Sequence, residues 1–349
     1  MKDSRPIVSV IMSVYNEKEE WIMESVNSIL NQTFSDLEFI IVNDNPTNKD
    51  CIDILEKVEK LDPRIHIMTN ERNSGLAYSM NRAMEIAKGK YVARMDADDI
   101  SLPTRLANQV EYLDRHKDIS ILGTQIKMFG HQEKYWINLS SPKEIKAKMF
   151  FKSCIAHPTA MFRIETLQKY NLFYDETYKS TQDYDLWSRA LFNVKLANLN
   201  KILLLYRIHE KQTSIAKKKE QESNFQNSQL NLLSNLIEDL SVEQRELSKY
   251  IWNGEKLESI EDQKKFKDLV LEIIEKNRAL KVFDPKEFEV PLINILVKKQ
   301  YHKDMSNYML LAKRAVGNNL FYTIFRKMRK SYNKTSTKTR YNFSGTRNK

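Results

Sequence analysis

Apolar runs and amphipathic segments alternate along the first 210 residues. The runs are nearly continuous and end in polar residues, as buried strands do, whereas the segments between them repeat apolar residues at helical spacing. Strands are expected at residues 7–14, 37–44, 64–69 and 90–96, and helices at 51–61 and 75–89. This alternation predicts an α/β fold with a mostly parallel sheet and right-handed crossovers.

Several of the expected strands are followed by polar side chains. Ligands of open parallel sheets bind beyond the carboxyl ends of the strands, so these side chains are the first candidates for a functional site. They are Tyr15, Asn16, Asn43, Asp44, Asn73 and the stretch Asp96–Asp99.

The pattern changes after residue 210. Segments rich in Lys, Glu and Asn follow, with apolar residues at helical spacing, and the last 20 residues are polar and basic enough to be disordered. We therefore expect an α/β domain over residues 1–215, a helical accessory region over 216–325 and a basic, disordered tail over 326–349.

Positive charge is concentrated in that tail. Residues 326–349 contain nine Lys or Arg and no Asp or Glu, which is almost the whole net charge of +10. No apolar run approaches the roughly 20 residues of a bilayer-spanning helix, and the amino terminus lacks the apolar centre of a signal peptide. We expect an intracellular, cytoplasmic protein whose tail either contacts the anionic inner face of the membrane or is simply solvated.

Other classes of function are disfavoured. Cys51 and Cys154 lie far apart without CxxC spacing, so neither a disulfide framework nor a zinc site is indicated. The pI near 9.2 would suit a nucleic-acid-binding protein, but the charge lies in the tail and the α/β part carries no RNA- or DNA-binding motif. No GxGxxG follows the first strand, which argues against a dehydrogenase.

Three aspartates crowd the end of the fourth expected strand, in "RMDADDISLP". Asp96 and Asp98 are one residue apart and can approach a single hard cation, such as Mg²⁺ or Mn²⁺, that is also held by substrate phosphates. The alternative is a solvated turn with an aspartate that caps a helix beginning near Pro103. From these residues alone both interpretations stay open.

Further motifs occur in a characteristic order. They are "VSVIMSVYNE", "EFIIVNDN", "NSGLAYSMNRAMEIAKGKYVARMDADD", "HPTAMFR", "TQDYDLWSRAL" and "YRIHEKQTS". Over roughly residues 6–215 the chain resembles the family 2 glycosyltransferases, which are inverting enzymes with the GT-A fold, a Rossmann-like sheet flanked by helices. It is particularly similar to bacterial β-1,3-N-acetylgalactosaminyl- and galactosyltransferases of capsule and lipopolysaccharide synthesis. The resemblance implies a nucleotide-sugar half over about 1–103 and an acceptor half over about 104–215.

The resemblance also implies a donor site and a metal site. Asp44 is expected to accept a hydrogen bond from uracil, and Asp98 to ligate Mn²⁺ or Mg²⁺ together with Asp96 and His209. The alternatives are that His209 contacts the diphosphate instead, and that Asp99 either caps or orients the loop. The implied nucleotide-sugar contacts are Ser13, Val14, Tyr15, Glu17, Asp44, Asn81, Arg82, Asp96, Ala97 and Arg207. From the residues alone, Asp44 would be a helix-capping turn residue and His209 a structural histidine.

Two positions depart from the family pattern. "NDNP" stands after the second strand where "DDGS" is common, and Met80 replaces the arginine that often precedes the residue matching Asn81. Arg82 or Arg94 is expected to compensate for that arginine in holding the diphosphate.

The resemblance implies that Asp183 of "TQDYDLW" is the catalytic base that deprotonates the acceptor hydroxyl. Helical spacing adds that Asp183 lies on the same face as Leu186, whereas Asp185 is roughly 200° away and cannot face the same pocket. A helix N-cap is the alternative for Asp183. Candidates for the acceptor side are His157, Tyr184, Asp185 and Trp187, with structural or core roles as the alternatives.

Together these features predict a metal-dependent inverting glycosyltransferase. The expected donor is UDP-GalNAc, UDP-GlcNAc or UDP-Gal, and the expected acceptor is a hydroxyl of a growing, lipid-linked bacterial surface glycan. The rival functions are a non-catalytic sugar-nucleotide-binding protein and a nucleic-acid-binding protein. For the helical accessory region, formation of a homodimer, acceptor binding and membrane docking are open alternatives.

Overall fold

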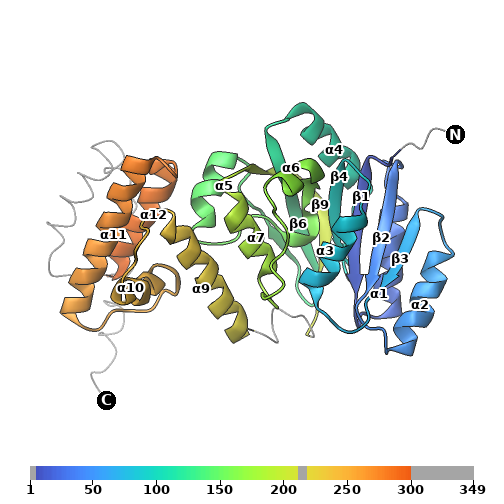
Figure 1. Ribbon diagram of the computed structural model, residues 1–349, viewed down its shortest axis with the longest axis horizontal. Helices are drawn as coiled ribbons and strands as arrows, with labels where there is room; N and C mark the ends of the chain where they lie inside the picture. The colour runs from blue at the N-terminus through green and yellow to red at the C-terminus, as the bar shows by residue number, and fades with distance from the viewer. Residues whose placement is uncertain (1–4, 211–217, 300–349) are drawn as a thin grey trace, which may run out of the picture. The chain divides into compact units, whose positions relative to one another are not determined.

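A mixed β-sheet forms the centre of the first part of the chain, seen in a computed structural model that describes residues 5–210 and 218–299 (Figure 1). Its strand order is β3-β2-β1-β4-β8-β6-β9-β5, and β7 pairs with β6. The strands are β1 (Val8–Val14), β2 (Leu37–Asn43), β3 (Ile65–Thr69), β4 (Tyr91–Asp96), β5 (Ile100–Ser101), β6 (Ile119–Gly130), β7 (Lys134–Trp136), β8 (Met161–Arg163) and β9 (Lys195–Ile208). The expected α/β fold is confirmed.

The order of the strands reverses between β1 and β4. The chain moves outward from β1 to β3 in parallel steps and then returns to pair β4 with the other side of β1. Right-handed crossovers therefore place α3 on the opposite face of the sheet from α1 and α2 (Figure 1). The helices of this part are α1 (Glu19–Leu30), α2 (Lys49–Glu59), α3 (Leu76–Ile86), α4 (Arg105–Arg115), α5 (Pro142–Met149), α6 (Ile164–Lys169) and α7 (Gln182–Ala190). Ligands of open α/β sheets bind at such a reversal, so we call the region beyond the carboxyl ends of β1 and β4 the crevice.

The central strands are buried on both faces, as their continuous apolar sequences predict. All seven residues of β2 are buried, and Val10 of β1 and Phe39 of β2 are fully inaccessible. Ile22, Val26 and Ile29 of α1, spaced by three and four residues, belong to the same core. Burial of each such side chain stabilises the fold by about 1.5–3 kcal/mol, so this core anchors the strands from whose ends the functional residues extend.

Beyond β4 the sheet is no longer purely parallel. β8 runs antiparallel to both β4 and β6, while β6 and β9 pair in parallel along most of their length. The pairing brings the carboxyl end of β9 next to the short strand β5, which directly follows the aspartate cluster. Residues more than 100 positions apart thereby meet beside Asp98.

Helix α9 (Lys218–Ser234) packs against the α/β part. Phe225 stacks on Tyr184 with 3.8 Å between ring centroids, and Asn224 Nδ2 donates a hydrogen bond to the Ser180 carbonyl. The chain divides into two compact units between Leu233 and Ser234. The structure therefore places α9 with the first unit, although the predicted accessory region begins at residue 216.

The second unit contains α10 (Val242–Trp252), α11 (Ile260–Leu280) and α12 (Pro285–Lys299). Ser241 caps α10 in a capping box with Gln244, and Ser259 caps α11. The α11–α12 turn is closed by the fully buried Asn277, whose side chain accepts from Phe283 N and donates to its carbonyl. Within residues 5–210 and 218–299, no helix is long and apolar enough to cross a membrane. The predicted tail at 326–349 lies outside the described residues.

Candidate active site

The predicted aspartates cluster at the reversal of strand order. Asp96 ends β4 and lies beside Ser13 of β1 in the parallel register. Carboxylate oxygens of Asp96, Asp98 and Asp99 lie within 4.8 Å of one another. Ser25 Oγ of α1 donates a hydrogen bond of 2.8 Å to the Asp96 carbonyl, which fixes the backbone where the strand turns.

The end of β9 delivers a histidine and an arginine to this cluster. His209 Nε2 lies 3.0 Å from Asp98 Oδ2, and Arg207 Nε donates a hydrogen bond of 2.7 Å to the Asp98 carbonyl. Helix α1 supports both side chains from the other side. The His209 ring lies 4.7 Å from the Trp21 ring, and the Arg207 guanidinium pairs with Glu24. The end of β9, itself supported by α1, therefore fixes the position of Asp98.

Asp99 differs from its neighbours because it is fully buried. Its Oδ1 accepts a hydrogen bond of 2.9 Å from Arg207 N, while Oδ2 has no partner among the described residues. Burial, reinforced by the nearby Asp96 and Asp98 carboxylates, raises the pKa of Asp99 well above its ordinary value. Its contacts fit the expected role of orienting the loop, since it joins the turn to β9.

Asp96 is paired with a buried arginine. Both guanidinium Nη atoms of Arg94 contact the Asp96 carboxylate, and the Arg94 side chain is 2% exposed. Burial raises the pKa of Asp96, and the Arg94 charge acts against this rise. Arg94 therefore faces Asp96 from within the protein, and a diphosphate in the crevice would meet the carboxylates rather than this guanidinium.

The donor atoms at this site fit a hard divalent cation. The Asp98 and Asp96 side chains remain 20% and 28% exposed, so their oxygens can be reached from the crevice. His209 Nδ1 is buried without a hydrogen-bond partner among the described residues. Carboxylate oxygens and one imidazole suit Mn²⁺ or Mg²⁺, whose remaining coordination positions water and phosphate oxygens fill.

The end of β1 forms the next wall of the crevice. Val14 is fully buried, whereas the following Tyr15 is 42% exposed and its backbone N–H donates a hydrogen bond of 2.7 Å to Glu17. Burial is the main cause that raises the pKa of Glu17. Ala97, between the two candidate ligands, is 3% exposed and can offer little more than backbone atoms. Three of the predicted donor contacts, Ser13, Val14 and Tyr15, are therefore consecutive residues at the end of β1 and directly after it.

Asp44 lies just beyond β2 and is 4% exposed. Its Oδ1 accepts from Asn70 Nδ2 and Ser74 N at 2.7 and 2.9 Å, and its Oδ2 accepts from Gly75 N at 2.9 Å. Gly75 is the N-cap residue of α3, so Asp44 holds the start of that helix. The capping alternative had concerned the helix that follows Asp44 directly, which is α2. Its expected contact with uracil stays a prediction.

Asn81 and Arg82 are both engaged in structural contacts. Asn81 accepts from Tyr174 N at 3.0 Å and donates to the Tyr174 carbonyl at 2.9 Å, and Arg82 Nη1 donates to Asn70 Oδ1 at 2.6 Å. These bonds hold the loop before α7 and the end of β3. The expected contacts of both side chains with the nucleotide sugar stay predictions.

Asp183 occupies the first turn of α7. Thr181, the N-cap, has a left-handed backbone conformation with φ of 62°, which is unusual for a β-branched residue and is typical of strained functional turns. Burial raises the pKa of Asp183, opposed by the Tyr184 backbone N–H and the Arg94 charge. The influence of Arg94 and Asp96 on Asp183 indicates that the predicted base and the aspartate cluster share one electrostatic environment.

His157 lies beside a residue that no motif identified. His157 Nε2 lies 2.8 Å from the Tyr174 hydroxyl, and the two rings pack edge to face at 5.5 Å. Burial, together with Arg94, lowers the pKa of His157 well below its ordinary value, and burial raises the pKa of Tyr174. Tyr174 also feels the charges of Asp183 and Asp96, so this neutral pair lies near the predicted base.

The other candidates for the acceptor side lie in the interior. Tyr184 is 1% exposed and donates to the Met149 carbonyl, and Trp187 is fully buried and stacks on Phe162. Asp185 is 2% exposed and forms an ion pair of 2.7 Å with Arg189. These contacts agree with the structural alternatives for the three residues, and their expected place on the acceptor side stays a prediction.

Sequence reasoning also missed Trp21, Glu24 and Arg105. The first two lie on one face of α1 and contact Arg207 or His209, and their spacing of three residues was the available signal. Arg105 is fully buried and donates to the Arg94 and Pro158 carbonyls. Nothing in its local sequence distinguishes it from a surface arginine at the start of a helix.

Comparisons with known proteins identify the family of this chain. Residues 9–172 match the family model described as glycosyl transferase family 2. A glycosyltransferase of Methanocaldococcus jannaschii is 41% identical over 229 residues, which cover 62% of this chain and 76% of that protein. The O-antigen biosynthesis glycosyltransferase WbnJ of Escherichia coli is 36% identical over 215 residues, covering 59% of this chain and 82% of WbnJ.

Solved structures show the same fold. A crystal structure of Staphylococcus aureus TarS in complex with UDP-GlcNAc superposes with a TM-score of 0.59 at 18% identity, covering 85% of this chain and 93% of that one. At this identity the likeness concerns the fold alone. The family match and the relatives described above show the family. This chain belongs to glycosyl transferase family 2 and is a glycosyltransferase with the GT-A fold.

Proposed function

We propose that this glycosyltransferase is a metal-dependent inverting enzyme that transfers a hexosyl or N-acetylhexosaminyl group from a UDP-sugar to a hydroxyl of a bacterial surface glycan. The observation that carries the proposal is the grouping of Asp98, His209 and Asp96 at the strand-order reversal, with Asp183 in the same electrostatic environment. One cation site and one carboxylate base are the two groups that such a transfer needs.

In this proposal Asp98 and Asp96 hold Mn²⁺ or Mg²⁺, and His209 orients Asp98 or ligates directly. When bound, the cation would offset the negative charge of the diphosphate leaving group. Arg94 keeps the Asp96 carboxylate in a fixed position, and the buried Asp99 ties the loop to β9. The edge formed by Ser13, Val14 and Tyr15 binds the nucleotide.

Asp183 removes the proton from the acceptor hydroxyl as the oxygen attacks the anomeric carbon on the face opposite the diphosphate. Partial burial suits this role, because a carboxylate with a raised pKa is a stronger base. The neutral His157–Tyr174 pair nearby can donate or accept hydrogen bonds at the acceptor side without adding charge.

Named relatives support the donor and acceptor classes. One is an Escherichia coli UDP-Glc:alpha-D-GlcNAc-diphosphoundecaprenol beta-1,3-glucosyltransferase, WfaP, 32% identical over 223 residues, and TarS was solved with UDP-GlcNAc. A Pyrobaculum calidifontis mannosyltransferase with a TM-score of 0.51 was solved with GDP-Man and Mn²⁺, so other nucleotides belong in the test.

The decisive experiment measures donor hydrolysis and thermal stabilisation with UDP-, GDP-, CMP- and dTDP-sugars in the presence of Mn²⁺, Mg²⁺ or EDTA. We expect a response to a UDP-sugar that requires the cation and is lost in Asp98→Ala. The matched control is Asp53→Asn, an exposed aspartate on α2. Nucleotide binding without any turnover on glycan acceptors would instead favour a non-catalytic sugar-nucleotide-binding protein.

A further inference from the structure

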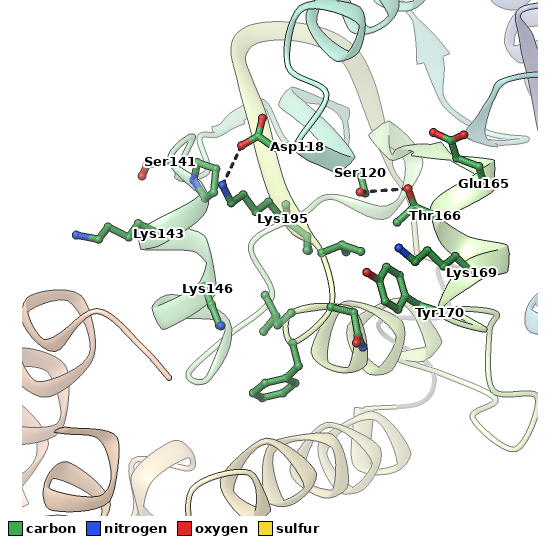
Figure 2. A pocket seen from close by; sticks show the side chains of 16 residues that line it. Asp118, Ser120, Ser141, Lys143, Lys146, Glu165, Thr166, Lys169, Tyr170 and Lys195 are labelled. Atoms are coloured by element: carbon green, nitrogen blue, oxygen red, sulfur yellow. Dashed lines mark hydrogen bonds and ion pairs between the residues drawn. The ribbon is translucent and has the colours of Figure 1, made fainter. Parts of the chain in front are cut away.

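A cavity of about 950 Å³ opens in the first unit, and none of the three clustered aspartates lines it (Figure 2). It lies among the amino-terminal ends of β6 and β9, the start of α5, the end of α6 and the loop that follows α7. None of the candidate active-site residues lines it. Its size is at the upper end of the range of about 300–1,000 Å³ for organic-ligand pockets.

Strand direction places this cavity at the opposite edge of the sheet from the candidate active site. β8 runs antiparallel to β4 and to β6, so β4 and β6 point the same way. The cavity lies where β6 begins, at Asp118 and Ser120, whereas Asp96 lies where β4 ends. A ligand in the cavity would therefore not occupy the donor site.

The cavity has an excess of positive charge. Four lysines and two carboxylates line it. Lys195 is neutralised locally by Asp118, with 2.9 Å between Nζ and Oδ2, and Figure 2 shows Lys195 directed at that carboxylate. Within residues 5–210 and 218–299, no carboxylate is close enough to form an ion pair with Lys146 or Lys169. Burial lowers the pKa of Lys146, so a bound anion would compensate for part of its lost hydration.

Each of these two lysines lies beside an aromatic ring. Lys146 Nζ is 5.6 Å from the centroid of the Phe192 ring, and Lys169 Nζ is 5.1 Å from that of Tyr170, which is 38% exposed. The cavity thus combines flat apolar faces with ammonium groups. A ring that offers both an apolar face and a charged substituent would complement each pair.

We propose that this cavity is a binding site for an acidic saccharide, a glycan segment that carries carboxylate or phosphate groups, and that it lies apart from the donor site. An inorganic anion would leave most of the volume empty, and a neutral sugar would leave the two lysines uncompensated. Since the chain is a glycosyltransferase, a glycan is a ligand that it meets, and the inference does not depend on the proposed donor or base.

The test is calorimetric titration of the full chain, without nucleotide or metal, with three probes. They are a tetrasaccharide of alternating glucuronic acid and N-acetylglucosamine, the neutral chitotetraose, and pyrophosphate. We expect the acidic tetrasaccharide to bind at least ten times more tightly than either other probe. Affinity should fall as salt is raised, because exposed charges are screened.

Variants locate the binding. The double variant Lys146→Gln/Lys169→Gln should weaken tetrasaccharide binding at least tenfold. The control Lys49→Gln/Lys60→Gln, which alters two exposed lysines at the two ends of α2, should leave it unchanged. Tyr170→Ala should weaken the tetrasaccharide but not pyrophosphate. Equal affinity for pyrophosphate or chitotetraose, or full tetrasaccharide binding by the double variant, would overturn the proposal.

Discussion

Two buried arginines lie behind the three aspartates and explain how these carboxylates coexist. Arg94 pairs with Asp96 from the interior, and the fully buried Arg105 donates to the Arg94 carbonyl. Burial lowers the pKa of Arg105 to about 9, while Asp99 acts in the opposite direction. Positive charge inside the protein thus offsets part of the repulsion, and Asp98 is left facing the crevice as the ligand that a cation would meet.

At the same scale, His209→Gln should weaken the cation site. His209 contacts the expected ligand Asp98, and loss of such a contact typically reduces metal affinity by about 10–100-fold. The measurement is the Mn²⁺ concentration that gives half-maximal donor hydrolysis. His116→Gln, which alters an exposed histidine directly after α4, should leave this concentration unchanged. If His209→Gln needed the same Mn²⁺ concentration as the wild type, His209 would not contribute to the cation site.

Asp183→Asn should lower kcat by about 10²–10⁴-fold, the contribution of a general base. The base must be ionised, and burial raises the pKa of Asp183, so wild-type activity should fall as the pH drops through a value above the ordinary pKa of about 3.9. The pH profile of kcat/KM and the affinity for the UDP-sugar test this. Affinity should be retained in the variant, and turnover equal to that of the wild type would show that another group is the base.

At the scale of elements, a side chain of α3 holds the loop that leads to the acceptor side. Asn81 forms hydrogen bonds with both the N–H and the carbonyl of Tyr174, and Tyr174 in turn contacts His157. Helix α3 is itself held by Asp44 at its first residues. Two polar residues expected to bind the donor therefore link β2, α3 and the loop before α7, and this coupling positions both sides of the crevice.

Asn81→Ala should lower the free energy of unfolding by about 1–3 kcal/mol, because it leaves the Tyr174 N–H and carbonyl without their partner. Thermal or urea unfolding of the variant measures the effect. Asn27→Ala, at an exposed position of α1, is the matched control and should have little effect. If the two variants were equally stable and only Asn81→Ala lost donor binding, Asn81 would be a donor-binding residue and not a structural one.

At the scale of the whole chain, the basic segment lies beyond the described residues, and its role rests on charge. The nine Lys or Arg of residues 326–349 would each contribute about 1 kcal/mol near an anionic membrane. Such contact would bring the α/β unit to a lipid-linked acceptor. The same segment, if merely solvated, would have no effect on membrane binding.

Deletion of residues 326–349 should therefore reduce binding to vesicles that contain anionic lipid by at least tenfold, while donor hydrolysis stays unchanged. Sedimentation with anionic and neutral vesicles, at low and high salt, provides the measurement. Neutral vesicles serve as the control, because they offer no surface charge. Unchanged binding to anionic vesicles would mean that the tail is not the membrane contact.

The sequence by itself determined the α/β alternation and the cluster at the end of β4. Both are local properties: continuous apolar runs form strands buried on two faces, and Asp96, Asp98 and Asp99 necessarily stay together because they are almost adjacent in the chain. Around α7, Asp185 is buried and pairs with Arg189, whereas Asp183 is half-buried, so the two carboxylates have different surroundings.

Only the tertiary structure decided which polar side chains remain accessible to a ligand and which form hydrogen bonds within the protein. Asn81 bonds to Tyr174, 93 positions away, and Asp99 accepts from Arg207, 108 positions away, whereas Asp98 stays partly exposed beside His209. Such partners are set by which strands pair and how helices cover them. The lysine-lined cavity arises in the same way, from strand starts and helix ends that are distant in sequence, so local residue patterns could not reveal it.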